Sequence, residues 1–160
     1  MKPITFAALA LMTASAMAGA GGKAMDGVSE QVQVDTTGGK VIVRLAAENR
    51  GKQAVYVPKA MYEDDELIAP AFDIREAGTG KQIEYIGRKV KRGAITKDDY
   101  VAVKPGTTKT NSIDITPSYD FLAGEHTYTL AFRGSLVSDL SNLVTPATVP
   151  VRPVSFIFRK

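Results

Sequence analysis

The chain has 160 residues, 44% hydrophobic and 23% charged, with a formal net charge of +3 at pH 7. These values are typical of one globular domain and exclude a wholly disordered or collagen-like chain. The sequence has no Cys and one His, His126, which excludes disulfide frameworks, thiolate metal sites and zinc sites built on two histidines. The small net charge gives no support for nucleic acid as a partner.

The N-terminus has the three features of a signal peptide. Lys2 supplies a positive charge, residues 4–14 are apolar or small, and Ala16-Met17-Ala18 places small residues where a signal peptidase reads them. An N-terminal membrane anchor is the alternative, but the apolar run is shorter than the roughly 20 residues that span a bilayer. We expect cleavage after residue 18, export to the periplasm or beyond, and no membrane anchor thereafter. Residues 19–27, rich in Gly and Ala, predict a flexible leader.

The rest of the chain, residues 28–160, predicts a single β-domain. Runs with alternating or β-branched apolar residues predict strands at residues 28–34, 41–46, 54–57, 72–75, 81–86, 100–104, 112–116, 127–132 and 155–158. Turn signals separate them, including Ala77-Gly78-Thr79-Gly80 in a hairpin and Pro105-Gly106. No stretch predicts an amphipathic helix of three turns. We therefore expect an all-β, immunoglobulin-like antiparallel β-sandwich of about seven or eight strands.

The same periodicity predicts the core of the sandwich. Nine residues are expected to be largely buried: Val43, Leu45, Val55, Phe72, Ile74, Ile86, Tyr128, Leu130 and Phe132. Tyr128 follows Gly124 at the start of a late strand, where a tyrosine hydroxyl can bond back to the preceding corner. An ordinary cross-strand aromatic is the alternative at this position.

A run of short motifs carries a resemblance to a known family. In order, they are Phe72-Asp73-Ile74, Ile83-Glu84-Tyr85-Ile86-Gly87, Val90-Lys91-Arg92, Asp99-Tyr100-Val101, Lys104-Pro105-Gly106, Ser118-Tyr119-Asp120-Phe121 and Tyr128-Thr129. Together they resemble the non-catalytic β-sandwich pro-region of secreted deuterolysin-like (aspzincin) zinc metalloproteases. In that family the pro-region precedes the protease domain and is removed on maturation.

The resemblance implies a domain without protease chemistry. A protease of this family would carry a His-Glu-x-x-His helix whose two histidines bind zinc, whereas His126 is the only histidine here. We expect no enzyme activity, no metal and no cofactor. A serine-based triad would need His126 with Ser112, Ser118 or Ser135, and no spacing singles one out.

The strongest charged feature is a basic run from Arg88 to Arg92. Arg88, Lys89, Lys91 and Arg92 place four cations in five residues, followed by Asp98, Asp99 and Tyr100 before the next strand. A long polar loop between strands is where sandwiches present binding residues, so these seven residues are the candidate partner-binding site. The alternative is a solvated edge with no partner. The acidic stretch from Glu63 to Glu66 is the second candidate surface.

These features lead to three hypotheses of function. The first is an exported, non-enzymatic module that binds a secreted zinc metalloprotease as inhibitor or folding assistant, because a pro-region that covers an active site in cis can do so in trans. The second is a structural or envelope immunoglobulin-like interaction domain with no protease target. The third is an inhibitor of unrelated proteases with the same fold.

Overall fold

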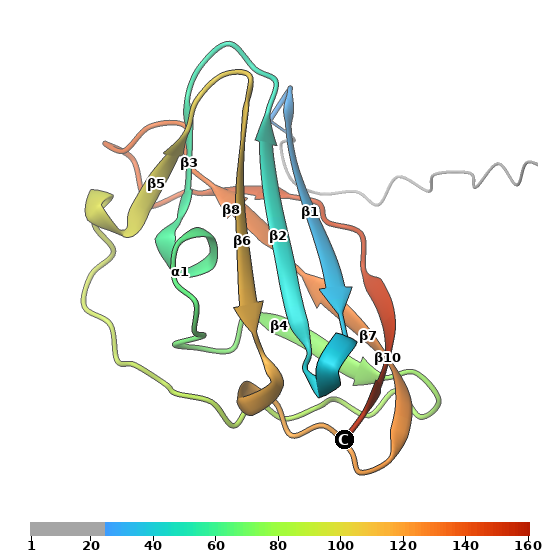
Figure 1. Cartoon of the computed structure of the whole chain (residues 1–160). Helices are drawn as coiled ribbons and strands as arrows, with labels where there is room; N and C mark the ends of the chain where they lie inside the picture. Colours follow the sequence, from blue (N-terminus) through green and yellow to red (C-terminus); the bar gives the residue numbers. More distant parts are fainter. Residues whose placement is uncertain (1–24) are drawn as a thin grey trace, which may run out of the picture.

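The computed structural model describes residues 25–160, which form an all-β fold with short helical turns (Figure 1). The strands are β1 (Val28–Asp35), β2 (Ile42–Asn49), β3 (Val55–Pro58), β4 (Phe72–Glu76), β5 (Tyr100–Val103), β6 (Thr107–Asp114), β7 (Glu125–Phe132), β8 (Gly134–Leu136), β9 (Ala147–Val149) and β10 (Val154–Arg159). The helical turns are α1 (Lys59–Tyr62), η1 (Thr37–Gly39), η2 (Lys97–Asp99) and η3 (Thr116–Ser118). The expected signal peptide, and the expected leader up to residue 24, lie outside the described residues.

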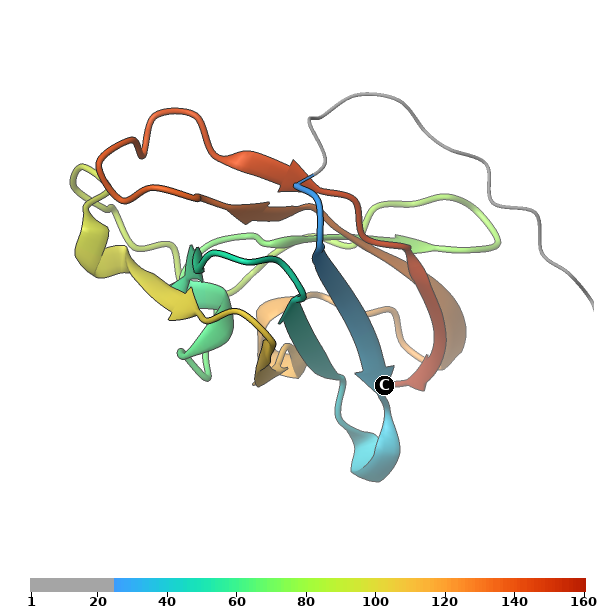
Figure 2. The ribbon, with the colours of Figure 1, turned by 90° about the horizontal axis from the view of Figure 1, so that it is seen from above.

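Two antiparallel sheets of three strands form the layers of the sandwich (Figure 2). One has the order β1-β2-β6 and the other β10-β7-β4. Two short pairs, β3-β5 and β8-β9, extend the layers, and Tyr56 of β3 exchanges two backbone hydrogen bonds of 2.9 Å with Val137 after β8. The predicted all-β antiparallel sandwich is confirmed. Its ten strands exceed the seven or eight expected, because β8 and β9, of three residues each, carry no clear alternation.

The core lies between the sheets and follows the predicted alternation, with one exception. Seven of the nine expected core residues are buried and Phe132 is half-buried against them. The prediction for Ile86 is wrong, because 56% of its surface is exposed. Residues 81–86 form only isolated bridges rather than a strand, and Ile83 and Tyr85 take the inward positions. Alternation then turns Ile86 outward.

Asn49 is the buried polar residue that fastens the end of β2. Its side-chain amide donates to the carbonyl oxygens of Gln53 and Val103, both at 2.8 Å, and its Oδ1 accepts from the Gly51 backbone at 2.9 Å. Its own carbonyl accepts from Gly106, which has a φ of +72° in the predicted Pro105-Gly106 turn. Because these side-chain groups all have partners, the buried amide stabilises the join between β2, the following turn and β5.

Two core tyrosines, Tyr128 and Tyr119, bond to backbone groups through their hydroxyls. Tyr128 accepts from the Leu122 N–H at 3.1 Å and also stacks on its cross-strand neighbour Phe156, with ring centroids 5.5 Å apart. Tyr128 is therefore both a tyrosine that bonds back to the preceding corner and a cross-strand aromatic. The Tyr119 hydroxyl accepts from the Phe72 N–H at 3.0 Å and donates to the Phe72 carbonyl at 2.9 Å. Along the same outer edge of β4, Ile74 O accepts from Ile83 and the Glu76 N–H donates to Lys81, both at 2.8 Å.

Alanine substitutions should distinguish buried from outward-facing positions on neighbouring strands by their effect on the free energy of unfolding. Leu130→Ala removes a fully buried side chain of β7 and should lower the free energy of unfolding by about 2 to 5 kcal/mol. Phe132→Ala should cost less than a fully buried aromatic would, because that ring is only half-buried. Ile157→Ala on β10 is the control and should stay within about 0.5 kcal/mol, since its side chain is exposed. Urea unfolding measures all three, and equal losses would contradict this core.

Candidate functional site

The segment 86–99 is a long exposed loop that is fixed at both ends. Near its start, the Tyr85 hydroxyl donates to the Arg88 carbonyl at 2.6 Å, and the Val90 N–H donates to the Ile68 carbonyl at 2.9 Å. Near its end, the Thr96 N–H donates to Asp99 Oδ2 at 2.8 Å, which caps η2. These hydrogen bonds hold the loop although most of it lies outside helices and strands, so its surface is partly ordered before any partner arrives.

The structure places six of the seven candidate residues on this loop but pairs some of their charges. Arg88 lies 3.3 Å from Glu66, in the second candidate surface, and Arg92 lies 3.6 Å from Asp99. Hydrogen bonds from Thr96, with a contribution from Arg92, hold the pKa of Asp99 below its ordinary value.

The other candidate residues differ in their surroundings. Lys89, Lys91 and Asp98 are exposed, whereas Tyr100 is half-buried at the start of β5, opposite Pro58. Lys89 also lines a depression of about 310 Å³ with Tyr85 and Tyr119.

Apolar side chains lie among these cations. The sequence pattern did not single them out as exposed. Ile86, Val90 and Ile95 expose 56%, 44% and 59% of their surface. They are three of the five large hydrophobic residues found exposed within residues 25–160. Exposed apolar groups gathered on one segment are a common mark of an interaction surface. We call residues 86–99 the basic–apolar loop.

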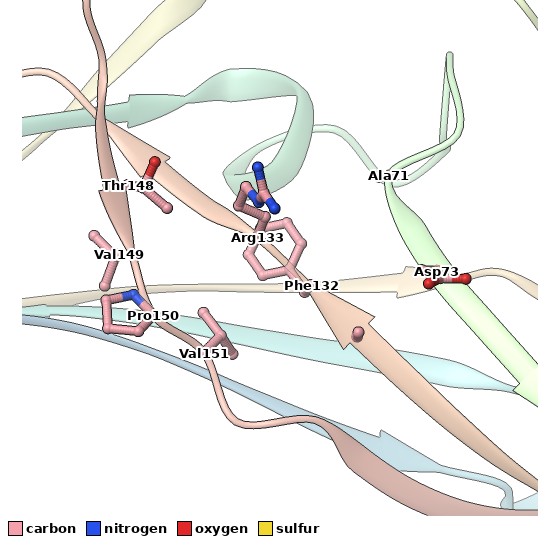
Figure 3. Close-up of a pocket in the computed structure, with 9 residues that line it drawn as sticks. Ala71, Asp73, Phe132, Arg133, Thr148, Val149, Pro150 and Val151 are labelled. Atoms are coloured by element: carbon pink, nitrogen blue, oxygen red, sulfur yellow. The ribbon is translucent and has the colours of Figure 1, made fainter. Parts of the chain in front are cut away.

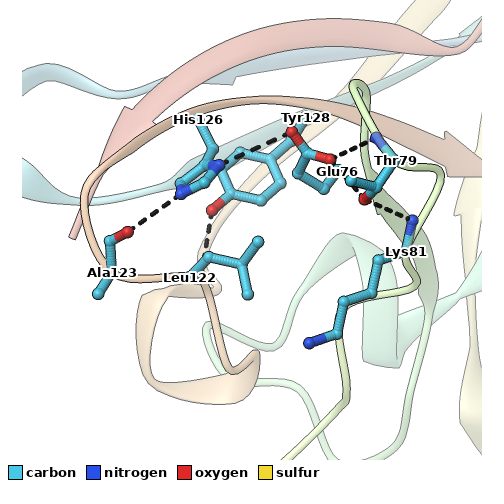
Figure 4. Close-up of polar contacts among 7 residues, drawn as sticks. All are labelled: Glu76, Thr79, Lys81, Leu122, Ala123, His126 and Tyr128. Carbon is cyan, nitrogen blue, oxygen red and sulfur yellow. Dashed lines mark hydrogen bonds and ion pairs between the residues drawn. The ribbon is translucent and has the colours of Figure 1, made fainter.

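His126 belongs to a polar cluster at the opposite end of β4 (Figure 4). Its Nε2 lies 3.0 Å from the Ala123 carbonyl oxygen and its Nδ1 lies 3.7 Å from Glu76 Oε1. Glu76 Oε2 accepts from both the backbone N–H and the hydroxyl of Thr79, each at 2.6 Å, and these bonds hold its pKa below the ordinary value. The cluster joins the hairpin after β4 to the turn before β7. Both ring nitrogens of His126 therefore face polar groups of this cluster.

Glu30 of β1 is the residue that the sequence analysis missed. Only 5% of its surface is exposed, and its Oε1 accepts from the Tyr62 hydroxyl at 2.8 Å. Its Oε2 has no hydrogen-bond partner among residues 25–160, and lies where a Cβ on Gly134 would stand, only 1.4 Å from that position. Burial raises the pKa of Glu30 to about 7 despite the Tyr62 hydrogen bond. The alternation Val28, Glu30, Val32 was the available signal, because it puts Glu30 in the inward phase.

Two other features, a metal-binding group of side chains and a membrane-spanning helix, are not found in the described part of the chain. Between residues 25 and 160, no three His, Asp or Glu side chains are grouped to hold a metal ion. In the same range, no helix is long and apolar enough to cross a membrane. The chain matches no protein-family model, and comparison with curated proteins finds no similar sequence.

The buried carboxyl of Glu30 should make stability depend on pH. Its folded pKa of about 7 lies above the ordinary 4.5, so the folded state binds more protons between these values. The free energy of unfolding should therefore fall by about 2 to 3 kcal/mol as pH rises from 4.5 to 7, then level off. Glu30→Gln keeps an acceptor for Tyr62 but cannot ionise. Urea unfolding across pH should show this fall in the wild type and lose it in the variant; parallel curves would contradict the assignment.

Gly134 and Glu30 should be energetically coupled. Gly134→Ala should destabilise the protein, because the new methyl group would overlap Glu30 Oε2 and approach the Val149 carbonyl oxygen at 3.1 Å. In a Glu30→Ala background the first clash is absent. A double-mutant cycle should therefore give a coupling on the order of 1 to 3 kcal/mol, with Gly134→Ala less costly when Glu30 is truncated. Additive losses would show that the carboxyl does not occupy this place.

Proposed function

We propose that this domain is an exported, non-enzymatic protein-binding module whose contact surface is the basic–apolar loop. The observation that supports the proposal is the combination found there: three exposed aliphatic side chains between cations, on a loop fixed by hydrogen bonds. Aliphatic groups contribute burial at the centre of an interface, and surrounding charges steer the approach of an oppositely charged partner.

The partner of this proposal is a secreted zinc metalloprotease of the deuterolysin type, with the domain acting as inhibitor or folding assistant. The resemblance of residues 72–132 to the pro-region of that family supports this choice, and the basic–apolar loop lies inside the resembling stretch. An acidic surface beside the protease active site is the complement that Lys89 and Lys91 would require, since neither lysine has an ion-pair partner within residues 25–160.

Neutralising the loop should weaken binding without unfolding the domain. Lys89→Ser, Lys91→Ser and Arg92→Ser together remove three exposed cations, so we expect about a tenfold slower association with the protease and a weaker salt dependence. Thermal stability should change little, because exposed substitutions usually stay within about 0.5 kcal/mol. Stopped-flow or surface-plasmon measurements with a purified deuterolysin-type endopeptidase give the rates, and peptide hydrolysis reports inhibition.

A matched variant removes the same charge elsewhere. Lys52, Lys81 and Lys104 are exposed and lie outside the basic–apolar loop, so replacing all three by Ser should leave association nearly unchanged. If the two triple variants slowed association equally, the effect would come from the net charge of the domain and not from the basic–apolar loop. If the wild-type domain neither binds nor inhibits the endopeptidase, the metalloprotease as partner is refuted, and an interaction domain without a protease target takes its place.

A further inference from the structure

A second surface lies where the pairing that joins β7 and β8 to β9 and β10 is interrupted. β10 pairs with β7 up to Val154–Leu130, and β9 pairs with β8 from Val149–Gly134. Between these pairs, residues 131–133 face residues 150–153 without any backbone hydrogen bond between them in the described chain. Pro150 and Pro153 lie in this interval and have no N–H to donate, which is a physical reason for the break.

The break opens into a groove. One depression of about 440 Å³ lies over the break, lined by Phe132, Arg133, Val149 and Pro150 (Figure 3). A second, also of about 440 Å³, shares Pro150 and Val151 with the first and extends along β1 from Ser29 to Gln33. We call the two adjoining depressions the Pro150 groove. Its walls combine apolar side chains with backbone that the sheets leave unpaired.

The β1 side of the groove is a strand edge that pairs with no strand other than β2 within residues 25–160. The Arg50 N–H donates to the Gly27 carbonyl at 2.7 Å, which makes positions 27 and 50 a hydrogen-bonded pair next to the Val28–Asn49 pair. Hydrogen-bonded and non-bonded pairs alternate along an antiparallel ladder. The N–H and C=O groups of Glu30 and Val32 therefore point away from β2, toward the groove. Within residues 25–160 they have no backbone partner.

The exposed charges of the groove are mostly positive, and the carboxyl of Glu30, which also lines the second depression, is only 5% exposed. Arg133 and Arg152 are exposed and line the two depressions, and neither has an ion-pair partner within residues 25–160. The carboxylate of Asp73 also lines the first depression, but Arg75 lies 3.1 Å from it. A ligand complementary to this groove would combine backbone donors and acceptors, apolar side chains and carboxylates.

We propose that the Pro150 groove binds an extended, acidic peptide segment of a partner protein by strand addition along β1, with Arg133 and Arg152 contacting its carboxylates. Main-chain hydrogen bonds supply affinity in this mode, and the side chains on alternate positions supply selectivity. Val149, Pro150 and Val151 provide the apolar wall for the peptide's β-branched residues. The proposal is independent of the basic–apolar loop, which lies on other residues.

The test uses defined peptides and the mature protein labelled with nitrogen-15. The probe is an acetylated, amidated heptapeptide, Thr-Val-Asp-Val-Asp-Val-Thr; one copy has Asn for Asp, and another has methylated backbone nitrogens at alternate positions. Titration followed by amide chemical shifts should perturb residues 29–33, 131–134 and 148–152. The Asn copy and the methylated copy should each bind at least about fivefold more weakly, because the first loses its charge and the second its backbone donors.

Variants of the protein test the two arginines. Arg133→Gln and Arg152→Gln should each weaken binding of the Asp peptide about three- to tenfold, and Arg44→Gln, an exposed arginine on β2, should not. The Lys89, Lys91 and Arg92 triple variant should bind it as the wild type does, which separates this proposal from the first. The proposal is overturned if no saturable shift occurs at the groove, if the methylated copy binds equally, or if all arginine variants behave alike.

Discussion

An aromatic cluster centred on Phe121 fastens the connection between the two sheets to the sheet β10-β7-β4, without any covalent link. The chain has no Cys, and the segment that leaves β6 for β7 carries Phe121 across the sandwich. The Phe121 ring lies 5.2 Å from Tyr128 and 5.2 Å from Phe158, in edge-on arrangements, and 6.4 Å from Phe156. Such pairs contribute about 0.5 to 1.5 kcal/mol each beyond their buried area. Both the corner at Tyr128 and the polar cluster that contains His126 adjoin these aromatic rings.

Period-two alternation was sufficient for the strands of the two three-stranded sheets except β6, which was expected at residues 112–116 and lies at Thr107–Asp114. It located β1, β2, β4, β7 and β10 to within a few residues, because an inward side chain every second position is a direct consequence of the pleat. It was not sufficient for residues 81–86, where the chain makes isolated bridges and Ile86 turns outward. It also left out Glu30, because a search for apolar residues at inward positions does not register a carboxyl among them.

The candidate sites depended on contacts that no local pattern contains. The basic run was visible in the sequence, but the ion pairs of Arg88 with Glu66 and of Arg92 with Asp99 join residues brought together by the fold. The Pro150 groove depends on a one-residue difference in register between two strand pairs. Prolines at 150 and 153 indicate an interruption, yet the sequence alone does not say which strand lies opposite. Register is a property of the whole sheet, which is why these features required the structure.

The outer edge of β4 has a consequence for how this domain behaves at high concentration. Tyr119, Ile83 and Lys81 take up the outward hydrogen-bonding groups of Phe72, Ile74 and Glu76 in turn. A free edge of an exposed sheet is where copies of a protein stack into aggregates. Because the Tyr119 hydroxyl and the backbone of Ile83 and Lys81 occupy these groups, this edge of the sheet is not available to a strand of a second molecule. At high concentration, copies of the domain are therefore kept from stacking along this edge by three contacts made within one chain.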